Sequence, residues 1–114
     1  MRHVGPREDS GPLSEPVLLI LMSLASEPRH GYALLKDIER LSGGRVCLST
    51  GTLYGALHRL LADERIERFA QEDTSREKQA YRLTPAGRRR LQSELERMKQ
   101  LTRAGMARLR VREA

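Results

Sequence analysis

The amino-acid sequence predicts a mainly α-helical fold with one small β-hairpin and a long C-terminal helix. Three observations support this prediction. Apolar residues recur at helical spacing in four separate segments, two short segments rich in strand-forming residues lie between the third and the fourth, and the fourth is much longer than the others. The 114 residues leave room for one compact domain.

Residues 1–12 are predicted to form a disordered N-terminal arm, because they mix glycine, proline and charges of both signs without periodicity. The charges of Arg2 and Arg7 are offset by those of Glu8 and Asp9. This balance favours a loose terminus over an arm that contacts a polyanion.

The first helix is predicted to begin at Ser14 to Pro16, where a capping hydroxyl precedes an acidic residue and a proline that loses no amide partner. The run from Val17 to Leu24 is apolar on nearly all sides, so this helix should be buried on more than one face. Glu27 and Pro28 are expected to end it.

A second helix is predicted from about His30 to Ser42. Leu34, Ile38 and Leu41 follow one another at spacings of four and three, which places them on one buried face, and the two glycines that follow Ser42 end the helix.

The third helix is predicted to start with Ser49 or Thr50 as its cap and to reach about Ala62. Its inward stripe consists of Leu53, Leu57, Leu60 and Leu61. The opposite side carries Gly51, Thr52, Gly55, His58, Arg59 and Ala62. This outer face is narrow, small and polar, so it can lie close in a groove that bulky side chains could not enter.

Two extended segments, Arg65 to Ala70 and Gln79 to Leu83, are predicted to pair as a β-hairpin around a polar turn. Arg76 and Lys78 place positive charge near the tip of this hairpin. Thr84 and Pro85 then start the last helix, which is predicted to run to about Arg112.

The last helix is too long for a domain of this size, and its apolar residues gather on one side. They are Leu91, Leu95, Met98, Leu101, Gly105, Met106 and Leu109. An amphipathic helix that projects beyond a small core must bury its stripe elsewhere, and a second copy of the same helix is the simplest partner. The sequence therefore predicts a homodimer.

The charge balance favours a polyanionic partner. Lys and Arg number 21 against 15 Asp and Glu, a formal net charge of +6, and 12 basic residues face four acidic ones between Arg76 and Ala114, a balance of +8. Nucleic acid fits this excess, although an anionic membrane surface would fit it too. Eighteen of the basic residues are Arg, which suits phosphate and guanine contacts or reflects the codon usage of a GC-rich genome.

Several functional classes are not expected. The chain has no apolar run long enough to span a membrane and no signal-peptide pattern, so a cytoplasmic location is expected. The single cysteine, Cys47, excludes an internal disulfide and is interpreted as a small, semi-buried apolar residue. The scattered His3, His30 and His58 predict no metal site. No nucleophile constellation or phosphate loop indicates an enzyme, and no cofactor is expected.

The order of helix, helix, helix, hairpin and long helix is that of the winged helix-turn-helix, and the residues resemble the PadR family of bacterial regulators over Leu13 to Leu109. The resemblance is carried by HGYALLKDIE (30–39), GTLYGALHRLLADERIER (51–68) and YRLTPAGRRRL (81–91). It is most specific in the middle segment, where GTLY precedes a Leu-x-Arg-Leu helix and a hairpin.

The resemblance implies a homodimeric transcriptional repressor. Residues 13–84 would form the DNA-binding domain and residues 85–114 the dimerisation helix, with the first and last helices holding two copies together. Each copy would bind one half of an inverted-repeat operator in double-stranded DNA, and a small-molecule effector of unknown identity would release it. The chain is similar to the short branch of the family, which has a single long terminal helix.

The expected DNA contacts lie on the second and third helices and on the hairpin, or wing. The start of the third helix, with Ser49, Thr50, Gly51 and Thr52, can offer amides and hydroxyls to a phosphate while it also caps the helix. His58 and Arg59 are the candidates for the major groove, the alternative being a solvated helix face.

Further DNA contacts follow from the family match. Tyr32 and Lys36 correspond to positions that reach the DNA backbone, and Tyr54 either contacts DNA or fills the gap between two helices. Arg76 and Lys78 would enter or flank the minor groove, although Glu72 and Asp73 dilute the charge of the wing.

The predicted dimer interface comprises Leu91, Leu95, Met98, Leu101, Gly105 and Leu109. Relatives that bind flat aromatic compounds between subunits carry an aromatic residue where this chain has Met98, so ordinary dimer core is the favoured interpretation of that position. Two alternatives to the repressor remain: a sequence-neutral architectural DNA-binding protein, and a winged-helix module whose third helix binds a partner protein.

Overall fold

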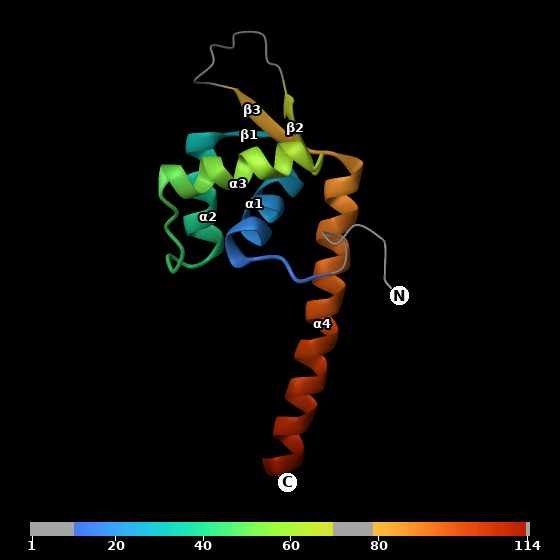
Figure 1. The fold of residues 1–114 in the computed structure, drawn as a ribbon. Coiled ribbons are helices and arrows are strands. Elements are labelled where there is room, and N and C mark those ends of the chain that lie inside the picture. Colours follow the sequence, from blue (N-terminus) through green and yellow to red (C-terminus); the bar gives the residue numbers. More distant parts are fainter. Residues whose placement is uncertain (1–10, 70–78, 114) are drawn as a thin grey trace.

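A computed structural model describes residues 11–69 and 79–113 of the chain (Figure 1). Most of the predicted arm, 1–12, and the wing residues Arg76 and Lys78 therefore lie outside the described residues. The elements are α1 (Glu15–Ser26), β1 (Arg29–His30), α2 (Gly31–Leu41), α3 (Thr50–Ala62), β2 (Ile66–Phe69), β3 (Ala80–Leu83) and α4 (Pro85–Glu113). The predicted mainly helical fold with a long C-terminal helix is confirmed.

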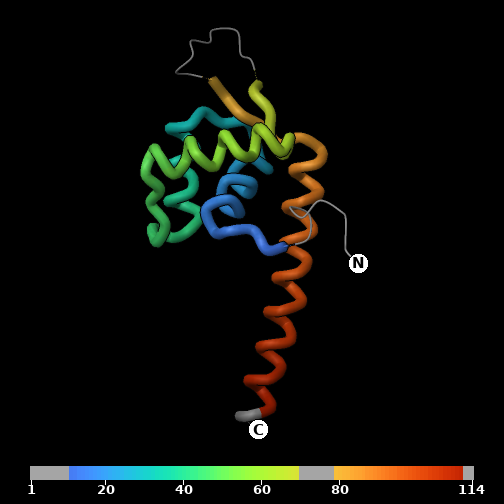
Figure 2. Tube along the Cα trace, in the orientation of Figure 1, coloured from blue at the N-terminus to red at the C-terminus, as the bar shows by residue number. Residues whose placement is uncertain are grey.

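Helix α1 lies at the centre of the domain, in contact with α2, α3, α4 and β3 (Figure 2). Ser14 caps it by accepting a hydrogen bond from the Val17 N–H at 3.4 Å, as the sequence predicts. Its buried apolar residues Leu19, Ile20, Leu21 and Leu24 lie on more than one side of the helix, as the sequence predicts. The core comprises Leu19, Ile20, Leu21, Leu24, Leu34, Ile38, Leu53, Ala56, Leu57, Leu60, Ile66, Tyr81 and Leu91.

The sheet has three strands rather than the two predicted. Their order is β1-β3-β2, with both pairings antiparallel, so β3 is the central strand. In β1, Arg29 pairs with Tyr81 and His30 pairs with Ala80. The second helix, predicted from about His30 to Ser42, lies one residue inside both limits: His30 is extended, with ψ 162°, and stands as the N-cap before Gly31, and Ser42 is the C-cap. The pairing partner of His30 lies fifty residues away in the sequence, so no local pattern reports it.

A buried polar cluster connects α1, β1 and α2. The Ser23 hydroxyl donates to the Asp37 carboxylate at 2.7 Å, and the guanidinium groups of Arg29 and Arg40 approach the same carboxylate at 3.6 and 3.1 Å. Asp37 is 8% exposed. Since a buried carboxylate is costly without partners, this set of partners fixes how α2 sits on α1.

The chain turns sharply between α3 and β2. The Glu64 N–H donates to Leu61 O at 3.1 Å and the Arg65 N–H donates to Leu60 O at 2.9 Å, which is the Schellman pattern of a helix end. Glu64 occupies the left-handed position of that pattern, with φ 61°. Thr84 then joins this turn to α4, because its hydroxyl donates to Glu64 O at 2.7 Å and its N–H donates to Arg65 O at 3.1 Å.

The first turns of α4 belong to the core. Leu91 is 5% exposed, and a Cβ at Gly87 would overlap the carbonyl oxygen of Arg65. Glu94, also buried, accepts hydrogen bonds from the Leu13 N–H at 3.2 Å and from Arg97 at 2.7 and 3.1 Å. These contacts attach α4 to the segment that leads into α1.

The rest of α4 projects away from the domain (Figure 1). This half of the helix still carries apolar side chains, with exposed fractions of 59% at Leu101 and 61% at Leu109. The described part of the chain contains no helix that is both long enough and apolar enough to cross a membrane.

Candidate nucleic-acid interface

The start of α3 is exposed and well capped. The Ser49 hydroxyl oxygen accepts from the Thr52 N–H at 3.1 Å and lies 3.0 Å from the Thr52 hydroxyl. Ser49 is the cap and Thr50 the first helical residue, and both are exposed, as are Gly51 and Thr52. The structure therefore brings the four residues predicted to meet a phosphate to one exposed helix end, where amides and the positive end of the helix dipole favour an anion.

The middle of the outward face of α3 consists of small residues around one histidine. Leu53, Ala56, Leu57 and Leu60 are buried on the inner side. The outer side carries Gly51, Gly55, His58 and Ala62, all exposed. Nothing lies within 4 Å of a Cβ built on Gly55, and on Gly51 the only such neighbour is the Ser49 hydroxyl oxygen at 4.0 Å. Packing in the described protomer therefore does not require glycine at either position, although glycine weakens a helix.

His58 and Arg59 occupy different places on α3. His58 lies in the middle of the outward face, whereas Arg59, about 100° further round the helix, lies at its flank. Arg59 lines a cavity of about 110 Å³ together with Leu13, which precedes α1, and Val17 in its first turn. Of the two, His58 is the side chain that stands between the small residues.

Tyr54 performs a packing role and is also exposed. A Cβ on Gly31 would overlap its hydroxyl group, so the ring closes directly over the start of α2. The side chain nevertheless remains 45% exposed. Burial raises the pKa of the neighbouring Tyr81, with a further contribution from Tyr54. Tyr54 thus fills the gap between α2 and α3 and presents its other side to solvent.

Helix α2 presents an aromatic and cationic pair. Tyr32 is 71% exposed, and the Lys36 ammonium lies 5.5 Å from the centre of its ring, within the range of a cation–π contact. His30 gives the helix no side-chain cap, and its Nδ1 is buried without a hydrogen-bond partner in the described part of the chain. Tyr32 and Lys36 stand next to this uncapped end.

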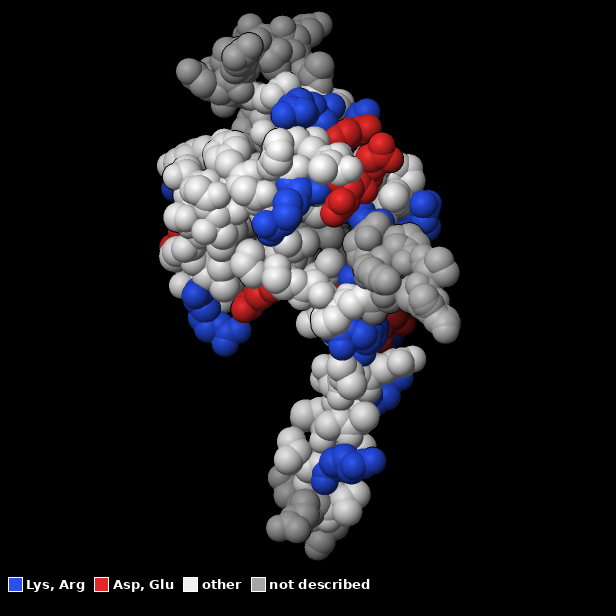
Figure 3. All heavy atoms as spheres, in the orientation of Figure 1, with Lys and Arg blue, Asp and Glu red and all other residues white. Residues whose placement is uncertain are grey.

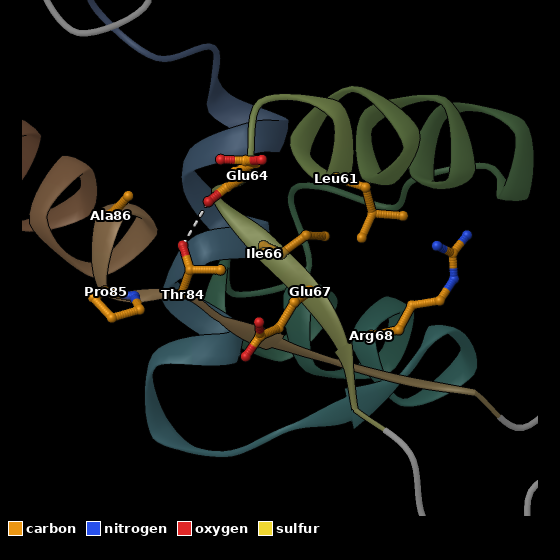
Figure 4. Close-up of a pocket in the computed structure, with 8 residues that line it drawn as sticks. All are labelled: Leu61, Glu64, Ile66, Glu67, Arg68, Thr84, Pro85 and Ala86. Carbon is orange, nitrogen blue, oxygen red and sulfur yellow. Dashed lines mark hydrogen bonds between the residues drawn. The ribbon is translucent and has the colours of Figure 1, made fainter.

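The wing adds arginines that the sequence interpretation missed. Arg68 on β2 is exposed, and its Nε donates to Gln79 Oε1 at 3.1 Å. Arg82 on β3 lies 2.8 Å from Glu67 and 4.7 Å from the centre of the Phe69 ring, so it is already engaged. Ile66 is buried, and the alternation of a strand places Arg68 on the same side of β2, where Figure 4 shows it beside Leu61 of α3. In the sequence, the two-residue spacing between Ile66 and Arg68 was the signal that could have identified Arg68.

Charge is unevenly distributed on the surface. Figure 3 shows Lys and Arg from the wing to the projecting helix, and on the same face a large group of Asp and Glu with smaller ones elsewhere. The turn from α3 into β2 carries three exposed acidic residues, Asp63, Glu64 and Glu67. A polyanion is therefore favoured at the start of α3 and disfavoured at its end.

Five of the six residues predicted for a dimer interface are exposed on α4. Leu95 is 40% exposed and Met98 36%, Leu101 and Leu109 are more exposed, and no atom lies within 4 Å of a Cβ on Gly105. Leu91 differs, because it is buried in the core of its own protomer. The free stripe therefore begins at Leu95.

Cys47 does not fit its sequence interpretation. It is an exposed free thiol in the connector before α3 rather than a semi-buried residue. Among the residues that the structure describes, no group of three or more His, Cys, Asp or Glu could hold a metal ion.

Comparison with known proteins identifies relatives. The model of the transcriptional regulator PadR-like family matches residues 20–93. The chain is 38% identical over 86 residues to the transcriptional regulator Rv3488 of Mycobacterium tuberculosis, covering 75% of this chain and 78% of that protein. It is 41% identical over 85 residues to a 37.1 kDa protein of transposon TN4556 in Streptomyces fradiae, covering 75% of this chain and only 23% of that protein.

Solved structures share the fold. A transcriptional regulator from Clostridium thermocellum has a TM-score of 0.67 and 26% identity, covering 81% of this chain and 89% of that one. The PadR protein of Bacillus subtilis in complex with operator DNA has a TM-score of 0.64 and 23% identity, covering 75% of this chain and 48% of that one.

Proposed function

Because the chain belongs to the PadR-like family of transcriptional regulators, we propose that it is a homodimeric, sequence-specific repressor that binds an inverted-repeat operator. Members of that family regulate transcription and are not enzymes, in agreement with the absence of catalytic motifs in the sequence. The proposed parts are an N-terminal arm (1–12), a DNA-binding domain (13–84) and a dimerisation helix (85–114).

The observation that carries this proposal is the outward face of α3. Gly51, Gly55 and Ala62 leave its backbone uncovered, so the helix can approach base edges more closely than a helix with larger side chains. His58 is the central side chain that would meet a base, and Arg59 at the flank can reach either a guanine or a phosphate. The capped start of the helix would receive a backbone phosphate.

Contacts on both sides of α3 would fix its orientation on the duplex. On one side, the exposed Tyr32, Lys36 and edge of Tyr54 would meet the phosphate backbone. On the other side, Arg76 and Lys78 of the wing would meet the minor groove, and Arg68 adds a cation at the base of the wing. The operator-bound relative from Bacillus subtilis supports DNA as the partner of this fold.

The dimer would form through α4. Leu95, Met98, Leu101, Gly105 and Leu109 lie along the projecting half of the helix, where the described protomer leaves them exposed. Leu18 and Met22 of α1 are half-buried apolar residues that would add to the same interface. Two copies packed through these surfaces would place two recognition helices on one duplex, as an inverted repeat requires.

Regulation by a small-molecule effector is part of the proposal. The described part of α4 contains no aromatic residue, so a ligand held by stacking on that helix is not expected. An effector would act at another place in the protein.

The first experiment is to recover and sequence genomic fragments that the purified full-length protein binds, at about 50 and about 200 mM salt. The higher salt concentration removes binding that depends on phosphate charge alone. We expect an inverted repeat near a promoter to remain enriched at the higher concentration.

The other outcomes identify other functions. Random fragments that disappear at the higher salt concentration would overturn the repressor and leave the architectural DNA-binding protein. If no DNA fragments are recovered at either salt concentration, the protein-interaction module is the remaining function.

A further inference from the structure

A cleft of about 550 Å³ lies where α3, the wing and α4 meet. Figure 4 shows it along the outer edge of β2, between the last turn of α3 and the first turn of α4. Its lining residues are Leu61, Glu64, Ile66, Glu67, Arg68, Thr84, Pro85 and Ala86. The volume is in the range of small-molecule sites, and four of these residues supply apolar walls.

The edge of β2 gives the cleft unpaired main-chain groups. β2 is the outer strand of the sheet and pairs only with β3 in the described part of the chain. The Thr84 N–H donates to Arg65 O, which makes Arg65 and Thr84 a hydrogen-bonded pair of the ladder. The alternation of an antiparallel ladder then turns the N–H and C=O groups of Ile66 and Arg68 toward the free edge.

Two charged groups of the cleft have no oppositely charged partner among the described residues, Glu64 and Arg68. Glu67 is paired with Arg82 at 2.8 Å, and Arg68 donates to Gln79 at 3.1 Å. Glu64 has no ion pair within the described residues, and its carboxylate is exposed. Arg68 keeps its positive charge because the Gln79 amide is neutral, but Figure 4 shows it toward the opposite end of β2 from Glu64. At the end of the cleft beside Thr84 the available charge is therefore negative.

Glu64 occupies a position where the backbone favours glycine. Its φ of 61° is left-handed, and it stands at the end of α3 where glycine has no steric penalty. Thr84 holds the turn in place through the bond from its hydroxyl to Glu64 O. Glycine would satisfy the backbone of this turn, and the glutamate adds an exposed carboxylate at the edge of the cleft.

We propose that this cleft binds an organic cation with an apolar body. An amidinium or ammonium group would pair with Glu64 and donate to the outward carbonyl oxygens of β2, and the apolar body would lie between Leu61 and Pro85. A molecule in this place contacts the recognition helix, the wing and the dimerisation helix together, so its binding changes operator affinity. That regulatory part rests on the proposed function, and the binding part does not.

The binding part is tested by titrating the ¹⁵N-labelled full-length protein with benzamidinium and following its amide signals. We expect saturable shifts at Glu64, Ile66 and Ala86. Benzamide, which has the same shape without the charge, and benzoate, which has the opposite charge, should bind at least about tenfold more weakly. Equal shifts with all three molecules, or no saturable shift with benzamidinium, would overturn the proposal.

Two substitutions connect binding to the carboxylate. Glu64→Gly relieves the left-handed backbone, so this variant should fold with an equal or higher Tm and yet bind benzamidinium at least about tenfold more weakly. Glu64→Gln should show the same loss, and Glu39→Gln, an exposed carboxylate on α2, should show none. If Glu64→Gly binds benzamidinium as tightly as the wild type, the carboxylate is not part of the site and the proposal is overturned.

The regulatory part is tested by measuring operator affinity with and without saturating benzamidinium. A change of at least about threefold is expected for the wild type and none for Glu64→Gly. No change in the wild type would overturn the regulatory part. If the protein binds no operator at all but the benzamidinium shifts are saturable, the proposed function fails and the cleft stands. If the operator binds and the shifts are absent, only the cleft fails.

Discussion

Gly55 illustrates how much a single residue contributes to the candidate interface. It lies on the exposed face of α3, and a Cβ there would meet no atom within 4 Å. Alanine is a better helix former than glycine by about 0.5–1 kcal/mol. A substitution to alanine is therefore free of clashes within the protein and adds a methyl group only to the surface that we propose faces DNA.

We expect Gly55→Ala to raise the free energy of unfolding by about 0.5–1 kcal/mol and to weaken operator binding at least about tenfold. Urea unfolding and fluorescence anisotropy with labelled operator measure the two effects. Gln100→Ala, on the exposed side of α4 away from the apolar stripe, serves as the control and should leave DNA affinity unchanged. Full affinity in Gly55→Ala would show that α3 does not approach DNA closely.

Glu94 gives a prediction about pH. The hydrogen bonds from Arg97, above all, hold the pKa of this carboxyl below its ordinary value. A lowered pKa in the folded state means that the group stabilises the fold above its unfolded pKa of about 4.3 and loses this contribution as the pH falls through the folded pKa. The contribution is therefore constant near neutrality and disappears in acid.

Glu94→Gln should lower the free energy of unfolding at pH 7 by about 1–3 kcal/mol, because a buried charge-assisted contact is lost. The difference from the wild type should begin to narrow as the pH falls below the unfolded pKa of about 4.3, and it should disappear below the lowered folded pKa, where the wild-type carboxyl is neutral in both states. Urea unfolding at a series of pH values measures this difference in the free energy of unfolding. Glu96→Gln, at an exposed neighbouring position, serves as the control. A difference that is the same at pH 7 and pH 3 would contradict this role.

At the scale of elements, local sequence signals placed the four helices and two of the three strands. Capping residues, glycines and apolar spacing act within a few residues, so the predicted starts at Ser14, Ser49 and Pro85 agree with the structure. Strand β1 escaped prediction because two residues carry no periodicity. Their only reason to be extended is pairing with Tyr81 and Ala80, a contact between distant parts of the chain.

The candidate site was predictable to a similar degree. The cap at Ser49 and the small outward face of α3 follow from the sequence pattern of one helix. The buried position of Leu91 does not, because the stripe of α4 continues without a break from the core onto the projecting half. Arg68 and the cleft beside it depend on how β2 lies against α3 and α4, which no single element encodes.

The junction of α4 with the wing depends on a glycine. A Cβ on Gly87 would overlap the backbone oxygen of Arg65, and a backbone atom cannot move aside as a flexible side chain can. We expect Gly87→Ala to lower the free energy of unfolding by about 1–3 kcal/mol, as measured by urea unfolding. Ser93→Ala, an exposed position on the same helix, should change it by less than about 0.5 kcal/mol. Equal stability of the two variants would contradict the close approach.

At the scale of the whole molecule, the projecting half of α4 is the feature that calls for a partner. We expect Met98→Glu to convert the protein from dimer to monomer, because a charge would have to be buried between two helices. Sedimentation measures the mass, and affinity for the full inverted repeat should fall at least about tenfold.

Gln100→Glu is the matched control for this experiment. It adds the same charge two residues away, on the other side of α4, and should leave the dimer intact. If the Met98→Glu variant is still a dimer, the dimer interface does not include this stripe. Dissociation of both variants would mean that overall charge, rather than the stripe, decides the state of assembly.

The short junction at Thr84 gives α4 the mechanical character of a stiff arm. β3 ends at Leu83 and α4 begins at Pro85, and Thr84 is bonded to the turn that follows α3. The 29 residues of α4 extend for about 43 Å. A rotation of about 10° at its base displaces the far end by about 7 Å, roughly two base-pair steps. In a dimer whose arms are joined, the angle at which α4 leaves the domain, held by Thr84 and by the buried Leu91 and Glu94, therefore sets the distance between the two half-sites that the protein can span.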